Sequence, residues 1–224
     1  MQIGHFNPTR YEYDGEKIIC QANFAERVKQ MKQETGTKIS IYRIALISVF
    51  AALVFAANWL YIPIPVAVGS MSRISLGNVF SLLSGLILGP IGGGLASGIG
   101  AALFDVTNPA YIASAPFTFV FKFLLAAVCG WIAHAKAAKG ENHKRNLVAA
   151  VCGSVTYIIL YLSKAFIQSM LVGNALNVTL LAVGEKLLTS SVNAVVAVII
   201  SVPLSAAIRL ALKKSGLMKK LEKE

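Results

Sequence analysis

Three charged side chains interrupt the long apolar runs of this 224-residue chain: Asp105, Lys122 and Lys164. A charged group inside a membrane-spanning helix costs roughly 2.5 to 3.5 kcal/mol on a translocon-insertion scale, and it usually faces a partner or a polar cavity. Six side chains that can donate, accept or stack accompany them in the same runs or at their ends: Asn58, Tyr61, Asn78, Tyr111, Gln168 and Asn193. Together these nine residues are the candidate substrate-binding residues, because such groups can hold a polar solute by hydrogen bonds and charge.

Other chemistry finds little support in the sequence. His5, His134 and His143 are far apart along the chain and show no metal-ligand spacing. The three cysteines, at positions 20, 129 and 152, have no paired spacing, and two lie in apolar runs, which is typical of buried inert thiols. We therefore expect no catalytic residue, no metal site and no cofactor held by this chain.

The composition is that of an integral membrane protein. Hydrophobic residues make up 56% of the chain and charged residues 14%, with a mean hydropathy of +0.66, which excludes a soluble enzyme, a disordered tail protein and a disulfide scaffold. A helix needs about 20 apolar residues to cross a bilayer. The fold class predicted is an all-α bundle of six transmembrane helices, over residues 41–62, 74–91, 92–108, 114–135, 147–172 and 181–212. A hairpin at Gly89-Pro90 separates the second span from the third.

Basic residues set the expected orientation. If both termini are cytoplasmic, 17 of the 21 lysines and arginines lie on the inner side, and Arg73 and Lys186 alone lie outside. The net charge of +11 is then a topology signal and gives no reason to expect a nucleic-acid partner. Residues 1–40 are expected to be a cytoplasmic extension, either amphipathic on the membrane surface or a frayed tail, residues 41–212 the membrane domain, and residues 213–224 a basic cytoplasmic tail.

With that orientation, the nine candidate residues all fall in the outer half of the membrane, whereas the inner halves are almost wholly apolar. This common depth predicts one pocket open to the outside, and it argues against a proton relay or a pore. Two structural alternatives stay open. Asp105 could pair with Lys122 or Lys164 only to hold helices together, and Asn193 could bond only a neighbouring backbone. Tyr61 and Tyr111 could equally belong to an interfacial aromatic belt.

Small residues mark two helix faces. In the third span, Gly94, Gly98 and Ala102 share a stripe that allows close backbone approach, so this helix is expected at the centre of the bundle. The first span carries a second stripe, formed by Ser48, Ala52 and Ala56. That stripe could pack inside the bundle or meet another membrane protein.

The stretch from Arg73 to Lys122 resembles the substrate-binding S components of energy-coupling factor (ECF) vitamin transporters. The residues that carry the resemblance are R-I-S-L-G-N, then G-P-I-G-G-G-L-A-S-G-I-G-A-A-L-F-D, and after them the pattern P-x-T-x-x-x-K that ends at Lys122. Ala52-x-x-x-Ala56 is similar to the small-residue motif by which S components dock on the transmembrane T component.

The resemblance implies a multi-pass protein of the bacterial plasma membrane that binds a vitamin or its precursor and performs no chemistry. Its implied partners are membrane lipid, a T component and two ABC-type ATPases, and those ATPases would use ATP and Mg. The loop after the first span, with Pro63, Pro65 and Gly69, would act as a lid. Cobalamin and the pyridoxine or pyridoxamine group are the first substrates expected from the resemblance.

Two other classes of protein remain possible from the sequence. A stand-alone secondary transporter or channel for a small solute is the main alternative, although the apolar inner half and the lack of an inverted repeat count against it. A non-transporting assembly protein is the third possibility, for which a polar pocket would be accidental. Co-purification with a T component and ATPases distinguishes the three.

Overall fold

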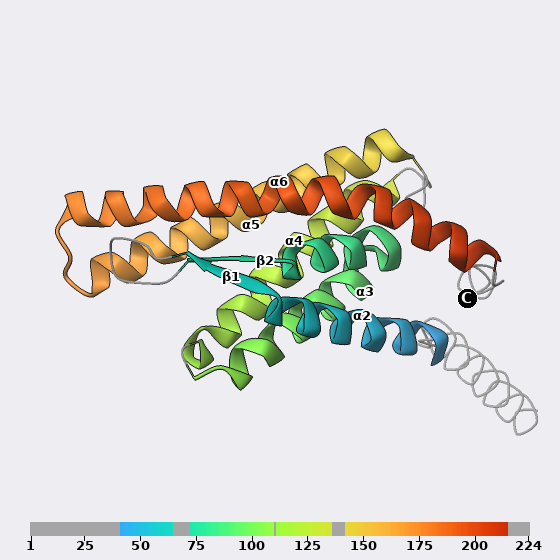
Figure 1. The fold of residues 1–224 in the computed structure, drawn as a ribbon, viewed down its shortest axis with the longest axis horizontal. Helices are drawn as coiled ribbons and strands as arrows, with labels where there is room; N and C mark the ends of the chain where they lie inside the picture. The colour runs from blue at the N-terminus through green and yellow to red at the C-terminus, as the bar shows by residue number, and fades with distance from the viewer. Residues whose placement is uncertain (1–40, 65–71, 110, 136–141, 215–224) are drawn as a thin grey trace, which may run out of the picture. The chain divides into compact units, whose positions relative to one another are not determined.

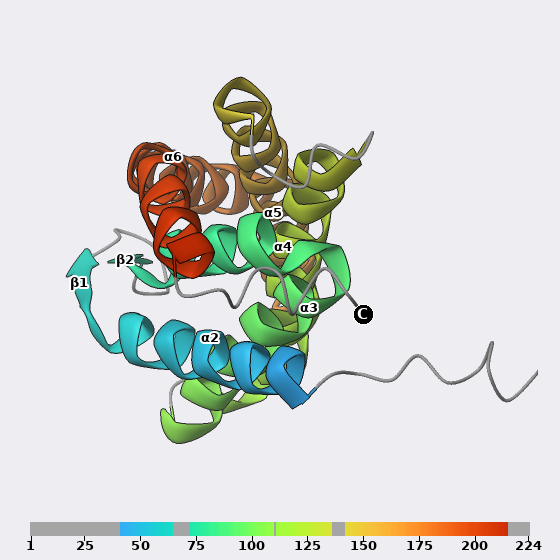
Figure 2. The same cartoon turned by 90° about the vertical axis from the view of Figure 1, so that its right-hand side faces the viewer.

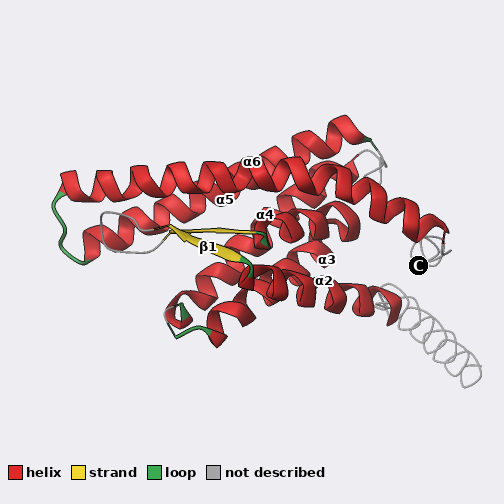
Figure 3. Ribbon diagram, in the orientation of Figure 1, coloured by secondary structure: helices red, strands yellow, loops and turns green. Residues whose placement is uncertain are grey.

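Long apolar runs with few interior charges form long helices in the computed structural model, which describes residues 41–64, 72–109, 111–135 and 142–214. The elements are α2 (Ile41–Trp59), β1 (Tyr61–Ile64), β2 (Ser72–Ser75), α3 (Gly77–Thr107), the short 3₁₀ helix η1 (Ile112–Ser114), α4 (Ala115–His134), α5 (His143–Leu171) and α6 (Leu176–Lys214). Figure 1 shows α5 and α6 running side by side, and α2 packing against α3. The predicted all-α class therefore holds for the membrane part, with one small hairpin added (Figure 3).

Within the described residues, five helices are long and apolar enough to cross a membrane, where the sequence predicted six spans. The difference lies in α3, which contains both the second and the third predicted span. Gly89 breaks this helix with φ +80° and ψ −170°, and Pro90 follows. The chain reverses there, and the Ser84 hydroxyl of the first arm donates to the Gly93 carbonyl of the second at 3.0 Å. The hairpin is thus confirmed, but the count of six crossings is not established.

The predicted second span also begins too early. Residues 74 and 75 belong to β2, and the first arm of α3, residues 77–88, extends only about 18 Å at 1.5 Å per residue. That length is shorter than the roughly 30 Å hydrocarbon core of a bilayer. The first arm is therefore a short buried helix and cannot cross a bilayer on its own.

The unpredicted hairpin pairs β1 with β2 in antiparallel register, with Tyr61 opposite Ser75 and Pro63 opposite Arg73. It lies between α2 and α6 in Figure 2. The hairpin positions Arg73 over the end of α3. Part of the expected lid loop, residues 65–71, lies outside the described residues. The predicted extension 1–40 and residues 215–224 of the predicted tail also lie outside them.

The core lies around α3, the most buried of the membrane-length helices. One apolar cluster contains Leu82, Leu86, Leu125 and Cys129, and a second contains Phe50. Small residues allow the close contact that the sequence predicted. A Cβ added at Gly94 would lie 2.8 Å from the Phe123 ring of α4, and one at Gly98 would lie 3.0 Å from the Phe119 ring. The small-residue stripe of α3 therefore packs against α4.

Candidate binding site

A cavity of about 570 Å³ is lined by residues of the hairpin and of helices α2, α3, α4, α5 and α6. Eight of the nine candidate residues line it: Asn58, Asn78, Asp105, Tyr111, Lys122, Lys164, Gln168 and Asn193. Tyr61 is not among the lining residues, and its ring packs edge-on against Phe104, with ring centroids 6.4 Å apart. Residues predicted to share one depth thus surround one space, although their role in binding stays a prediction.

An ion pair forms one end of the cavity. Arg73 Nη2 donates to Asp105 Oδ1 at 3.2 Å, and the Asp105 side chain is 2% exposed. The Arg73 guanidinium also lies 4.7 Å from the centre of the Phe104 ring and 4.4 Å from that of Tyr111, so two aromatic rings hold it in place. The structural alternative, in which Asp105 pairs with Lys122 or Lys164, differs from the structure, because Arg73 reaches the carboxylate from the hairpin.

Asn193 joins the hairpin to α6. Its Nδ2 donates to the Arg73 carbonyl at 2.8 Å, and its Oδ1 accepts from the Ser75 backbone N–H at 3.1 Å. Both halves of the amide are therefore engaged by the backbone of β2. This agrees with the alternative in which Asn193 bonds only a neighbouring backbone. Through these two bonds Asn193 holds the cavity wall in position.

Lys122 lies deep in the wall at 4% exposure. Its ammonium group donates to Asn78 Oδ1 and lies 5.0 Å from the centre of the Tyr157 ring. Tyr157 in turn stacks on Tyr161 one helical turn later, with ring centroids 5.9 Å apart and planes 9° from parallel. This part of the cavity combines a buried cation with a flat aromatic surface.

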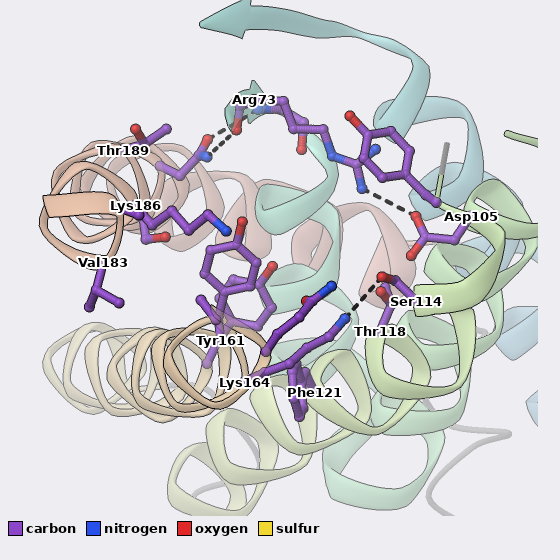
Figure 4. Close-up of a pocket in the computed structure, with 18 of the residues that line it drawn as sticks. Arg73, Asp105, Ser114, Thr118, Phe121, Tyr161, Lys164, Val183, Lys186 and Thr189 are labelled. Carbon is purple, nitrogen blue, oxygen red and sulfur yellow. Dashed lines mark hydrogen bonds and ion pairs between the residues drawn. The ribbon is translucent and has the colours of Figure 1, made fainter. Parts of the chain in front are cut away.

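Lys164 occupies the α5 side of the cavity. Its Nζ donates to the Ser114 hydroxyl at 3.0 Å and lies 4.8 Å from the centre of the Phe117 ring. Gln168 follows one turn later and is exposed. Figure 4 shows Lys164 and Lys186 extending into the same space from α5 and α6, with the Arg73–Asp105 ion pair at one edge of it.

Asn58 is held by its own helix, since its Nδ2 donates to the Val54 carbonyl at 2.8 Å. It is 2% exposed and lies directly against the start of α3. A Cβ added at Gly77 would come within 2.3 Å of Asn58 Oδ1. Glycine at position 77 is therefore what lets α3 begin beside this asparagine.

Sequence reasoning missed four prominent lining residues: Arg73, Tyr157, Tyr161 and Lys186. Arg73 and Lys186 were counted only as loop charges on the outer side. Their presence on the side that basic residues avoid was the signal that could have identified them. The i, i+4 spacing of the two tyrosines likewise places both rings on one face of α5.

The stripe of Ser48, Ala52 and Ala56 is exposed along α2. The opposite face, with Phe50, Ala51 and Val54, is buried. The described helices therefore leave this stripe uncovered, and its role in docking stays a prediction. Within the described part of the chain, no group of three or more His, Cys, Asp or Glu side chains could hold a metal ion.

Comparison with known proteins identifies the family. The chain is 34% identical over 107 residues to a protein of Pyrococcus woesei described as an "uncharacterized protein in gap 3'region"; the match covers 47% of this chain and 66%, just under two thirds, of that relative. A family model described as "ECF-type riboflavin transporter, S component" matches residues 38–210. Since that match spans more than half of the sequence, as well as the described helices from α2 to most of α6, the chain is a multi-pass membrane protein that belongs to the family of S components of ECF-type riboflavin transporters.

Proposed function

We propose that this protein is the substrate-binding subunit of an ECF transporter and that its ligand is a vitamin of the riboflavin type. The observation that carries the proposal is the cavity of about 570 Å³ that gathers the polar residues of five helices and the hairpin. Its volume falls within the roughly 300 to 1,000 Å³ that is usual for small-molecule sites. The family match supports riboflavin and gives no support to cobalamin or to the pyridoxine group.

The cavity wall suits a flat ring system with polar edges. Tyr157 and Tyr161 present a stacked aromatic pair, and Phe121 lines the cavity from α4. Aromatic faces bind planar rings by offset or edge contacts worth about 0.5 to 1.5 kcal/mol beyond area burial. Polar groups at the rim, such as Thr118 and Gln168, can meet ring heteroatoms or hydroxyl groups.

The proposed orientation has both termini in the cytoplasm and the cavity open to the outside. Described basic residues at the opposite end of the helices from the cavity support it, namely Arg43, Lys144, Arg145, Lys213 and Lys214. Basic residues that flank spans prefer the cytoplasmic side. The ligand would then enter from outside the cell. Whether that cell is bacterial stays a prediction, as does the plasma membrane as its location.

The proposed partners are a T component and two ABC-type ATPases that use ATP and Mg, while this chain performs no chemistry. The exposed stripe of Ser48, Ala52 and Ala56 supports docking by close helix contact, since small residues let two backbones approach where lipid supplies no hydrophobic drive. A stand-alone transporter or channel has no such requirement.

Titration of the purified protein in detergent with riboflavin, followed by quenching of flavin fluorescence, tests the ligand. We expect saturable binding at one site per chain. Failure of riboflavin to bind the chain, or to compete with another bound ligand, would contradict the riboflavin proposal.

Co-expression tests the assembly. A T component and ATPases should co-purify with the chain, and uptake in liposomes should need ATP, whereas uptake by this chain alone would favour the stand-alone alternative.

A further inference from the structure

The charges that line the cavity do not balance. Among the described lining residues there are four basic side chains, Arg73, Lys122, Lys164 and Lys186, and one carboxylate, Asp105. Asp105 is already paired with Arg73 at 3.2 Å. Three lysines therefore share one half-enclosed cavity without a carboxylate of their own.

The neighbours of these lysines are neutral. Lys122 donates to an amide oxygen of Asn78, and Lys164 donates to the hydroxyl of Ser114. For Lys186, the structure gives neither a hydrogen bond nor an ion pair with any described residue. Glu185 precedes Lys186 but is not among the residues that line the cavity.

Such an excess of one charge is costly in this environment. A charge taken out of water is tolerated when an opposite charge and hydrogen bonds compensate it, and three like charges around one space also repel. Neutral acceptors such as amides and hydroxyls offset only part of this cost. Among the described residues that line the cavity, Asp105 is the one carboxylate, so an anionic ligand would supply the negative charge that the lysines lack.

We propose that the ligand carries an anionic group, a phosphate or a carboxylate, and that the ammonium groups of Lys164 and Lys186 hold it. The inference rests on the proposed function in that it takes the cavity as the ligand site, and it adds a charged substituent to the expected ring system. Both lysines extend into the cavity from neighbouring helices (Figure 4), whereas Lys122 lies deeper and bonds Asn78. The aromatic pair Tyr157 and Tyr161 lies on the same helix as Lys164, so one ligand can place a ring and an anionic group within this wall.

The first test compares riboflavin with riboflavin 5′-phosphate as probes for the purified chain. Loss of one charge-assisted hydrogen bond changes affinity about tenfold to hundredfold. We therefore expect the phosphate ester to bind at least about tenfold more tightly than riboflavin. K164Q and K186Q should each remove most of this preference, while K144Q, which changes an exposed lysine at the start of α5, should retain it.

The second test does not depend on flavins. The melting temperature of each variant is measured in phosphate, acetate and chloride at matched ionic strength. Phosphate or acetate should raise the melting temperature of the natural chain and of K144Q above the value in chloride, and it should not do so for K164Q or K186Q. Whether phosphate or acetate stabilises more indicates which anionic group the ligand carries.

The outcomes separate this inference from the proposed function. Binding of neither flavin, together with lysine-dependent stabilisation by an anion, would contradict the riboflavin-type ligand and support the anionic one. Equal affinities for the two flavins, without lysine-dependent stabilisation by any anion, would overturn the anionic ligand and leave the riboflavin proposal standing. A phosphate preference that survives in both lysine variants would also overturn the inference.

Discussion

Arg73 and Asp105, which are separated by 32 residues in the sequence, join the hairpin to the C-terminal end of α3 across 3.2 Å. Arg73 belongs to β2, and Asp105 lies in the last turn of α3. The hairpin is otherwise short, with four residues in each strand, so it needs such attachments to hold its position. The ion pair and the Asn193 amide supply two of them.

We predict that Asp105→Asn destabilises the folded protein by roughly 1.5 to 3 kcal/mol, the usual worth of a hydrogen bond to a charged group. The Arg73 guanidinium would keep its place between two rings but lose its counter-charge. Thermal unfolding in detergent measures the change. The double variant R73M/D105N should lose less than the two single losses added, because both single changes break one contact. Simple additivity would mean that the pair contributes little.

We predict that Lys164→Ala weakens ligand binding by roughly 1.5 to 3 kcal/mol, because it removes a charge-assisted donor from the cavity. Fluorescence titration of the purified variant measures this. Ser114→Ala is a matched variant, since it removes the hydroxyl that accepts from Lys164 and leaves the ammonium group in place. It should weaken binding far less. Unchanged affinity in Lys164→Ala would assign this lysine to the fold alone.

The depth of each residue along its predicted span was enough to predict that the candidate residues meet, and eight of the nine line one cavity. Polar groups at one depth in a helix bundle face the same interior space. The partner of Asp105 was beyond that reasoning. Arg73 reaches it only because the chain folds back as a hairpin, and two four-residue strands next to an apolar run leave no clear alternation in the sequence. Lys186 falls inside the predicted span 181–212, but it was counted only among the outer charges, and that count gives no sign that it lines the cavity from α6.

The break in α3 gives a prediction about stability. Gly89 has φ +80° and ψ −170°, a conformation that is almost restricted to glycine, so Gly89→Ala should cost about 1 to 3 kcal/mol. Gly184→Ala is the matched control. Gly184 lies within α6, and a Cβ there would meet nothing within 4 Å, so alanine should be neutral or stabilise the helix by up to about 1 kcal/mol. Thermal unfolding compares the two. Equal effects would mean that the chain can reverse direction without glycine.

The exposed stripe on α2 gives a prediction about transport. Ala52→Trp and Ala56→Trp should abolish ATP-dependent uptake by the reconstituted complex and leave ligand affinity unchanged. Both positions are exposed, so the indole has room in the isolated chain, but it would prevent close approach of a partner helix. The paired measurements are ligand titration of the purified variant and uptake by proteoliposomes that contain the T component and the ATPases.

Two further tryptophan variants separate docking from folding. Ile159→Trp changes a residue of α5 that is 59% exposed, and it should affect neither measurement. Ala51→Trp changes a residue that is 8% exposed and whose carbonyl would lie 2.3 Å from a Cβ at Gly100, so it should overpack the α2–α3 contact and reduce binding and uptake together. If Ala52→Trp behaves like Ala51→Trp, the stripe belongs to the fold. If it behaves like Ile159→Trp, it faces only lipid. Docking requires loss of uptake alone, with the T component no longer co-purifying.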